Sequence, residues 1–329
     1  MTMRTLWIGC VLSHVAFAAL GAEGRTPIYE PIEITTQGAY VLTQDVRGTS
    51  PVIVIDANEV DLDLNGFRVI GDGPEPVIAL SQQDNVRIRG GFVQGAGEGL
   101  SVSQGDGVVL ADLTVSGSSG TIVDVSQTSA ARITRVRVRG QTEYRSLSIL
   151  GGEAVVVRDL RVESSQSFEA IITSSVDGGR LENAVITGAM DGSGDALYVS
   201  NADGSVFSRI LVSGSFANGM EIVGSDGTRL VRATVIGSGS GYFGIQSEDV
   251  LVGEACFVGN EDGISTIFAS RWLVERNLTN ANDDGLTFGF GSDDSVTRAN
   301  VSRGNALNDF GDLGTGNDSA GDNFLPTRQ

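Results

Sequence analysis

A short apolar segment recurs eleven times along the chain, and this repeat constrains the fold more than any other feature. The copies start 21–26 residues apart, and in most of them the first, fourth and sixth positions are apolar. They begin at Leu64, Ile88, Leu110, Ile133, Val157, Leu181, Phe207, Leu230, Val252, Leu273 and Val296. A unit of this length cannot bury its own apolar face, so neighbouring units are expected to stack and share one continuous core.

A second apolar stretch precedes most copies, as in "VIVIDA" at Val52, "LYVS" at Leu197 and "LTFGF" at Leu286. These stretches alternate and are rich in β-branched residues, which is typical of strands. No window of eleven or more residues beyond the first 22 keeps a 3.6-residue period. The pattern therefore predicts an all-β, single-domain solenoid of parallel strands with about 11–12 coils.

The repeated pattern V-x-L-x-x-L-x-V-x-G, with "GI" or "DGI" opening the next strand, resembles that of the pectate-lyase-like superfamily. The resemblance extends roughly from Tyr29 to Asn308 and implies a right-handed parallel β-helix. Members of the superfamily include polysaccharide lyases, hydrolases, epimerases and pectin esterases, together with adhesins and metal-handling periplasmic proteins. Because one fold carries many functions, the resemblance alone selects none of them.

The chain is expected to divide into four segments. Residues 1–22 combine a basic start, a short apolar run and small residues, which is the pattern of a signal peptide. Residues 23–50 are interpreted as an N-terminal cap or first coil, 51–309 as the β-helix, and 310–329 as a C-terminal cap or tail. No other stretch reaches the roughly 18 apolar residues that a membrane span requires. We therefore expect a secreted or periplasmic protein.

Composition excludes several kinds of chemistry. The 41 acidic residues outnumber the 22 basic ones, all of which are arginine, and the formal net charge is −19. Such a surface argues against nucleic-acid binding, which depends on cations that contact phosphates. The one histidine, His14, lies in the expected signal peptide, and Cys256 is the one cysteine outside it. Serine–histidine–aspartate catalysis and zinc sites rich in histidine or cysteine are therefore excluded from the mature chain.

The third position of the repeated segment carries mostly polar residues, often of opposite charge on successive copies. These residues are Gly66, Gly90, Asp112, Arg135, Asp159, Asn183, Arg209, Arg232, Glu254, Glu275 and Arg298. Stacked at a corner of a solenoid, they are interpreted first as a ladder of ion pairs.

Seven arginines crowd into residues 132–161, and the repeat predicts that Arg137 lies directly over Arg161. Arginine binds carboxylates and sulfates through two parallel hydrogen bonds. Arg135, Arg137, Arg161 and Tyr144 are therefore candidates for binding an acidic polysaccharide. In lyases of the superfamily that the chain resembles, an arginine or lysine acts as the base on a uronate, which implies that role for Arg137 or Arg161. The alternative is a solvated strand face neutralised by nearby acids.

Two acidic clusters, "NEDG" and "NDDG", lie 22 residues apart. The repeat predicts that Asp262 and Asp284 are neighbours on adjacent coils, with Asp283 beside them. The spacing resembles the paired acids of polygalacturonase-type glycoside hydrolases, which implies catalysis by Asp262, Asp283 and Asp284. The histidine and lysine motifs of that family are missing here. Ordinary turn chemistry and a Ca²⁺ site of stacked oxygen atoms are the alternatives.

The sequence favours a protein that binds polysaccharide along one flank, with acidic glycans preferred. Whether it also processes the glycan stays open at this point. A non-catalytic scaffold or adhesin is one alternative, and a uronate-active lyase or glycoside hydrolase is another.

Overall fold

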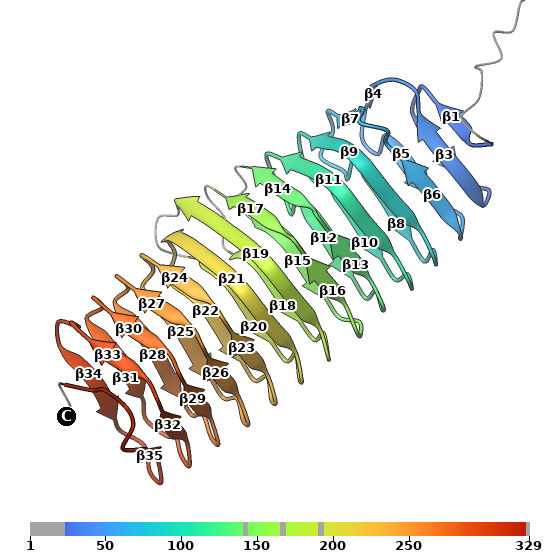
Figure 1. Ribbon diagram of the computed structural model, residues 1–329. Helices are drawn as coiled ribbons and strands as arrows, with labels where there is room; N and C mark the ends of the chain where they lie inside the picture. Colours follow the sequence, from blue (N-terminus) through green and yellow to red (C-terminus); the bar gives the residue numbers. More distant parts are fainter. Residues whose placement is uncertain (1–23, 141–143, 165–168, 190–193, 327–329) are drawn as a thin grey trace, which may run out of the picture.

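The computed structural model describes residues 24–140, 144–164, 169–189 and 194–326. The described residues form one all-β rod, a parallel solenoid of about 12 turns, with no helix among them. Figure 1 shows the N-terminal coil at one end of the rod and the C-terminal coil at the other. The fold class expected from the repeat and from the superfamily resemblance is confirmed.

One face of the rod is a 13-stranded parallel sheet, here called sheet B, which receives one strand from each coil. Its strands are β2 (Ile32–Ile34), β5 (Ile53–Ile55), β8 (Ile78–Ser81), β10 (Leu100–Ser103), β12 (Val123–Ser126), β15 (Arg145–Leu150), β18 (Glu169–Ser174), β20 (Asp195–Ser200), β22 (Asn218–Val223), β25 (Ser240–Ile245), β28 (Asp262–Ile267), β31 (Asp284–Phe288) and β34 (Asn308–Asp312).

A 22-stranded parallel sheet, here called sheet A, forms the other two faces as two rows. Row A1 contains β1 (Thr26–Ile28), β3 (Gly38–Leu42), β6 (Val60–Asp63), β13 (Arg132–Thr134), β16 (Val156–Arg158), β23 (Arg229–Val231), β26 (Leu251–Gly253), β29 (Leu273–Glu275), β32 (Val296–Arg298) and β35 (Asp318–Ser319). Row A2 contains β4 (Val46–Gly48), β7 (Arg68–Gly71), β14 (Arg137–Gly140), β17 (Arg161–Ser164), β24 (Thr234–Ile236), β27 (Cys256–Val258), β30 (Leu278–Asn280) and β33 (Val301–Arg303). Four longer strands run through both rows: β9 (Arg87–Gly95), β11 (Val109–Gly117), β19 (Arg180–Ala189) and β21 (Val206–Ser215).

Alternation along each strand builds the core. In β12, the side chains of Val123 and Val125 are buried in the interior, while Asp124 between them lies on the outer face. Larger side chains fill the C-terminal half, where the rings of Tyr242 and Trp272 meet edge to face at 5.7 Å between centroids. Because every coil contributes to the same interior, the rod has one continuous core rather than separate domains.

The corner between rows A1 and A2 turns on a residue with left-handed backbone conformation, for example Asp112 at φ 55° and Arg135 at φ 52°. In the last two copies this residue is Arg276 (φ 55°) or Ala299 (φ 52°), one position later than the sequence pattern indicated. The expected positions, Glu275 and Arg298, were wrong. The error arose because Leu273 and Val296 are apolar but precede the true core positions.

The expected ladder of ion pairs is present at this corner. Arg135 binds Asp112 through two hydrogen bonds of 2.5 and 2.8 Å, and Arg232 binds Glu254 at 2.8 Å. These side chains are about half exposed. Exposed pairs contribute only about 0–1 kcal/mol each, so the ladder mainly neutralises stacked charge.

Buried asparagines form two further ladders in the C-terminal half of the rod. In one, Asn260 donates its backbone N–H to Oδ1 of Asn282 at 2.9 Å, and Asn282 does the same to Asn305 at 3.0 Å. In the other, Asn277 bonds to Asn300 in the same way at 2.9 Å. Each amide satisfies backbone groups that the corner would otherwise leave unpaired.

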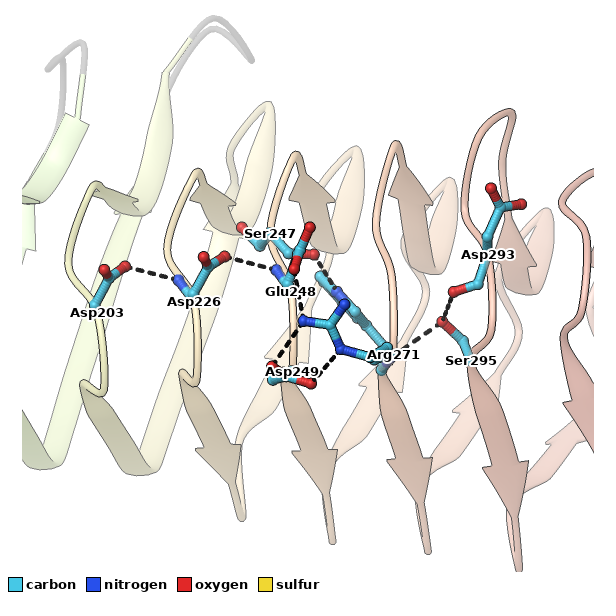
Figure 2. A network of polar contacts seen from close by, with 9 residues as sticks. Asp203, Asp226, Ser247, Glu248, Asp249, Arg271, Asp293 and Ser295 are labelled. Carbon is cyan, nitrogen blue, oxygen red and sulfur yellow. Dashed lines mark hydrogen bonds and ion pairs between the residues drawn. The ribbon is translucent and has the colours of Figure 1, made fainter.

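The corner between sheet B and row A1 is lined by acidic side chains that serve as turn chemistry (Figure 2). Asp203 accepts a hydrogen bond from the backbone N–H of Asp226, and Asp226 accepts one from Glu248, both at 2.8 Å. Arg271 then binds Glu248 at 2.6 Å and Asp249 at 2.8 Å. Most acids at this corner therefore accept hydrogen bonds from the backbone of the next coil and do not form a ligand site.

The ends of the rod are coils of the same solenoid. Strand β1 stacks on β3, and β2 to β4 build the first complete coil, within the segment that was expected to be a cap or first coil. At the other end β34 crosses the expected boundary at residue 309, β35 pairs with β32, and Phe324 bridges to Val301. Residues 310–326 thus extend the solenoid by most of another coil.

Candidate functional site

A line of polar residues, here called the strand-start row, opens the strands of sheet B on successive coils. The register places side by side Arg145, Glu169 and Asp195, and then Asn218, Ser240, Asp262, Asp284 and Asn308. The two groups join where the backbone N–H of Asn218 donates to Oδ1 of Asp195 at 3.1 Å. Neighbours in a parallel sheet lie about 4.8 Å apart, so this row is a continuous polar line along the rod.

A second line, here called the outer row, lies three positions further along the same strands. In register it contains Ser101, Asp124, Ser148, Ile172, Tyr198, Glu221, Phe243, Ser265 and Thr287. These positions alternate with the buried core positions of each strand, which places their side chains on the outer face of sheet B.

The two rows meet at a pair of carboxyl groups on β20 and β22. The side-chain amide of Asn218 donates to Oδ1 of Asp195 at 3.0 Å and to Oε2 of Glu221 at 2.7 Å. Asp195 is only 9% exposed. Asn218 thus holds two acidic side chains in one place at the centre of the sheet.

Burial is the main cause that raises the pKa of Asp195 to about 7, and the charge of the neighbouring Glu221 is the next cause, because two adjacent negative charges repel. Burial likewise raises the pKa of the Tyr198 hydroxyl, with Glu221 as the next cause. At neutral pH the pair therefore holds a proton that it can donate, while the second carboxyl group can accept one.

Two further groups extend the site toward the N-terminal end. Nε of Arg145 binds Oε2 of Glu169 at 3.0 Å. Burial is the main cause that raises the pKa of Asp124, and Arg145 opposes this rise. Burial also raises the pKa of Glu98 to about 7, with the charge of Asp124 as the next cause. Over the five coils from β10 to β20, three carboxyl groups thus have raised pKa values.

The predicted acids Asp262 and Asp284 lie in the same strand-start row and face each other on adjacent strands, as expected. Burial raises the pKa of Asp262, and Asp284 is the next cause. Asp284 accepts a hydrogen bond from the side chain of Asn308 at 2.9 Å, while Asp283 is exposed. Within the described ranges, no arginine forms an ion pair with these three acids.

The structure separates the predicted substrate-binding arginines. Arg137 and Arg161 are neighbours on β14 and β17, as expected. Both bind Glu163, together with Arg139, and the Glu163 contacts of Arg161 and Arg139 measure 3.0 and 2.9 Å. Arg135 lies apart from them at the A1–A2 corner, because its left-handed backbone turns the side chain to Asp112.

Tyr144 is 58% exposed and directly precedes β15, so it borders sheet B rather than row A2. The arginine cluster, defined here as Arg137, Arg139 and Arg161 with Glu163, therefore lies on a different face from the acid pair. It carries two more positive charges than negative ones.

Sequence reasoning missed Asp195, Glu221 and Tyr198. Reading the column of Asp262 and Asp284 back toward the N-terminus at steps of 22–26 residues leads through Ser240 and Asn218 to Asp195. The position of Asp195 in this column could therefore be predicted from the repeat alone. The hydrogen bond from Asn218 to Glu221 could not, because it depends on side-chain geometry between two rows.

No group of three or more histidine, cysteine, aspartate or glutamate side chains in the described part of the chain is arranged to hold a metal ion. None of the described segments is a helix with the length and apolar character needed to cross a membrane. The site is therefore built from carboxyl, amide, hydroxyl and guanidinium groups.

Comparison with known proteins supports the fold. No protein-family model and no curated protein sequence matches the chain. Among solved structures, the A-module of the Azotobacter vinelandii mannuronan C-5 epimerase AlgE4 is similar with a TM-score of 0.56 at 12% identity, covering 93% of this chain and 91% of that one. The periplasmic alginate epimerase AlgG is similar with a TM-score of 0.55 at 10% identity, covering 85% of this chain and 76% of that one. At such identities the likeness concerns the fold alone.

Proposed function

We propose that this protein binds polysaccharide along the outer face of sheet B and processes it at the Asp195–Glu221 pair. The observation that carries the proposal is the Asn218 bridge, which holds two carboxyl groups together on an exposed face while one of them is buried enough to keep a proton near pH 7. Two proteins of similar fold are named as epimerases of alginate and mannuronan, which are polysaccharides.

The chemistry of the pair fits cleavage of a glycosidic bond. A carboxyl group that stays protonated at neutral pH donates to the leaving oxygen, and a carboxylate held this close to it can attack the sugar carbon as the nucleophile of a retaining mechanism, after which water releases the sugar from the enzyme. Tyr198, whose raised pKa keeps its hydroxyl neutral, supplies a hydrogen-bond donor beside them. Sheet B supplies a rigid platform, because each of these residues is held in a hydrogen-bonded strand.

A glycan panel tests the proposal, read for binding and for new reducing or unsaturated ends. Asp195→Asn and Glu221→Gln are expected to lower the rate of cleavage by about 10²–10⁴-fold with binding largely retained. Asp112→Asn is the matched control, because it makes the same chemical change at the far corner. Equal activity in all three variants would exclude the pair. Failure to bind or cleave any polymer would favour the alternative of a non-catalytic scaffold or adhesin.

A second location for catalysis is the set Asp262, Asp283 and Asp284, which the sequence pattern indicated as hydrolase-like. The adjacency of Asp262 and Asp284 and the raised pKa of Asp262 favour it. The double substitution Asp262→Asn plus Asp284→Asn separates the two locations. Loss of cleavage in this variant, with normal activity in Asp195→Asn, would move the reaction to the C-terminal end of the rod.

The arginine cluster is proposed as a contact for acidic groups of a glycan, since Glu163 neutralises only one of its three positive charges. Arg137→Ala plus Arg161→Ala is expected to weaken binding of acidic polymers. Unchanged affinity for acidic polymers in this variant would exclude the arginine cluster as a glycan contact. Arg135, which is engaged by Asp112, is the matched control position.

Export to the periplasm or the medium is proposed from residues 1–22, which lie outside the described residues. The described strands begin at Thr26, shortly after the expected cleavage site. Mass spectrometry of the protein from a secreting host tests this, with an expected mature N-terminus at residue 22 or 23. An intact N-terminus on protein recovered from the cytoplasm would argue against export.

A further inference from the structure

Charge is divided unequally between the two sheets. The strands of sheet B contain a single arginine, Arg145. They contain nine acids, namely Glu33, Asp124, Glu169, Asp195, Glu221, Asp262, Asp284, Asp309 and Asp312. The strands of sheet A hold most of the arginines, including five in β9, β13 and β14 together. The face that carries the candidate site is therefore the negative face of the molecule.

The one cation on this face is already engaged. Arg145 is bound to Glu169, and it is also the charge that partly offsets the raised pKa of Asp124. A glycan carboxylate or sulfate placed over β18 to β22 would meet the acid pair Asp195 and Glu221, and the one arginine of the sheet B strands is not free to bind it, because Arg145 is engaged by Glu169. A like charge beside such a pair is unfavourable, so polyanions are disfavoured there.

Several hydrogen-bonding groups in and beside sheet B are left without partners. Oε1 of Glu98 and Oδ1 of Asn308 are buried and have no hydrogen-bond partner among the described residues, and the same holds for the hydroxyl groups of Ser146 and Thr173. A hydroxyl group both donates and accepts hydrogen bonds. A ligand rich in hydroxyl groups can therefore pair with acceptors and donors alike.

Apolar surface is interleaved with these acceptors. In the outer row, Ile172 and Tyr198 are register neighbours, and Glu221 is followed by Phe243. Tyr198 and Phe243 are partly exposed. Sugar rings present apolar C–H faces together with hydroxyl edges, and sites that bind such ligands combine aromatic surface with a few placed polar groups.

We propose that the sheet B site accepts a stretch of uncharged, hydroxyl-rich sugars and rejects polyanionic glycans. This inference rests on the proposed function of the same face. It differs from the acidic-glycan preference expected from the sequence, because the arginines that motivated that preference lie on sheet A. Where an acidic glycan is bound, the arginine cluster is its contact, and the acid pair is not.

The test compares size-matched neutral, uronate-containing and amino-sugar polymers at low and moderate salt. The full-length mature protein and the Arg137→Ala plus Arg161→Ala variant are both used, so that the arginine cluster does not contribute in the second. In that variant the neutral polymer is expected to bind at least about tenfold more tightly than the uronate polymer, a difference of 1.4 kcal/mol. Binding of the neutral polymer is expected to change little with salt, because no ion pairs form.

Removing charge provides the second arm. Glu98→Gln plus Asp124→Asn is expected to raise the affinity for the uronate polymer several-fold relative to that for the neutral polymer, because the two amides keep their hydrogen-bonding capacity and lose their charge. Tighter binding of the uronate polymer than of the neutral one, in the variant without the arginine pair, would overturn the inference while leaving polysaccharide binding intact, whereas tighter binding of the cationic amino-sugar polymer would agree with the negative charge of this face. Absence of binding to every polymer would instead overturn the proposed function.

Discussion

At the scale of single residues, the structure is decided by how each buried polar atom finds a partner. Most do so across adjacent coils, because the same atom type recurs at the same place on the next turn. Two exceptions matter. The hydroxyl of Tyr242 is fully buried and has no hydrogen-bond partner among the described residues, and Asp195 keeps its partners but is surrounded by too little water to ionise easily. Each exception leads to a measurable expectation.

Replacing Tyr242 with phenylalanine is expected to stabilise the protein by roughly 1–3 kcal/mol, because it removes a buried hydroxyl that makes no hydrogen bond. The ring and its edge contact with Trp272 remain. Denaturant midpoints measure the change. Tyr40→Phe is the matched control: its hydroxyl donates to the Thr36 carbonyl at 2.8 Å, so its loss lowers stability by about 1 kcal/mol. A destabilised Tyr242→Phe variant would mean that the hydroxyl has a partner.

Stability is expected to fall as the pH rises from about 4 to about 7, in part because of Asp195. Its pKa is raised from 3.8 to about 7 in the folded state, so the folded protein binds the proton more tightly than the unfolded chain does. The stabilisation is complete below the unfolded pKa and is lost as the pH passes through the folded one. Melting temperatures across this range are expected to fall less steeply for Asp195→Asn.

Asp112→Asn serves as the control for this pH dependence, because the Arg135 hydrogen bond lowers the pKa of Asp112 and gives its contribution the opposite sign. An Asp195→Asn profile parallel to that of the unsubstituted protein would show that Asp195 has an ordinary pKa.

At the scale of structural elements, side-chain ladders between coils supply hydrogen bonds to backbone N–H and C=O groups that would have no backbone partner at the tight corners. The Asn260–Asn282–Asn305 ladder is an example. The side chain of Asn282 accepts from Asn260 and donates to the Phe257 carbonyl at 3.2 Å. Such a ladder requires the corner to recur at nearly the same interval: Asn260 and Asn282 are 22 residues apart, and Asn282 and Asn305 are 23 apart. The ladder therefore fixes the corner of each coil relative to the next.

Asn282→Ala is expected to cost about 2–4 kcal/mol, since it leaves the backbone N–H of Asn260 and the carbonyl of Phe257 buried without partners. Asn280→Ala, two residues earlier on the outer face of β30, is the matched control and is expected to stay within about 0.5 kcal/mol. Chemical denaturation measures both. Equal costs for the two substitutions would mean that the ladder contributes nothing beyond a single surface residue.

Much of the fold followed from the spacing of apolar residues, because a repeat that cannot bury itself must stack. The adjacency of Asp262 and Asp284 followed as well, since both begin strands of coils with equal length. The corner positions in the last two copies did not, because Leu273 and Val296 mimic the core pattern one position too early. The raised pKa of Asp195 could not be predicted, because it arises from burial and from contact with Glu221, and the sequence reveals neither.

At the scale of the whole molecule, charge is arranged by face. Sheet A carries arginines that pair with acids of neighbouring coils, while sheet B and the turns that follow it carry acids in excess. The chain has 41 acidic and 22 basic residues, so the paired arginines cannot balance the total. Salt therefore has two opposing effects: it weakens the ion pairs, and it screens repulsion among the surplus acids.

The second effect is expected to dominate, so that the melting temperature rises by several degrees between about 20 mM and about 500 mM NaCl. Coils lie about 4.8 Å apart, well within the screening length of about 10 Å at 0.1 M salt, so each surplus carboxylate repels several others at low salt. The ion pairs at the A1–A2 corner are about half exposed and contribute only about 0–1 kcal/mol each. Screening of these pairs by salt therefore costs little stability. KCl at the same ionic strength must give the same rise, since screening does not depend on which monovalent cation is present. A melting temperature that falls with salt would show that the ladders outweigh the repulsion, and the negative face would then be too weak to exclude a polyanionic glycan.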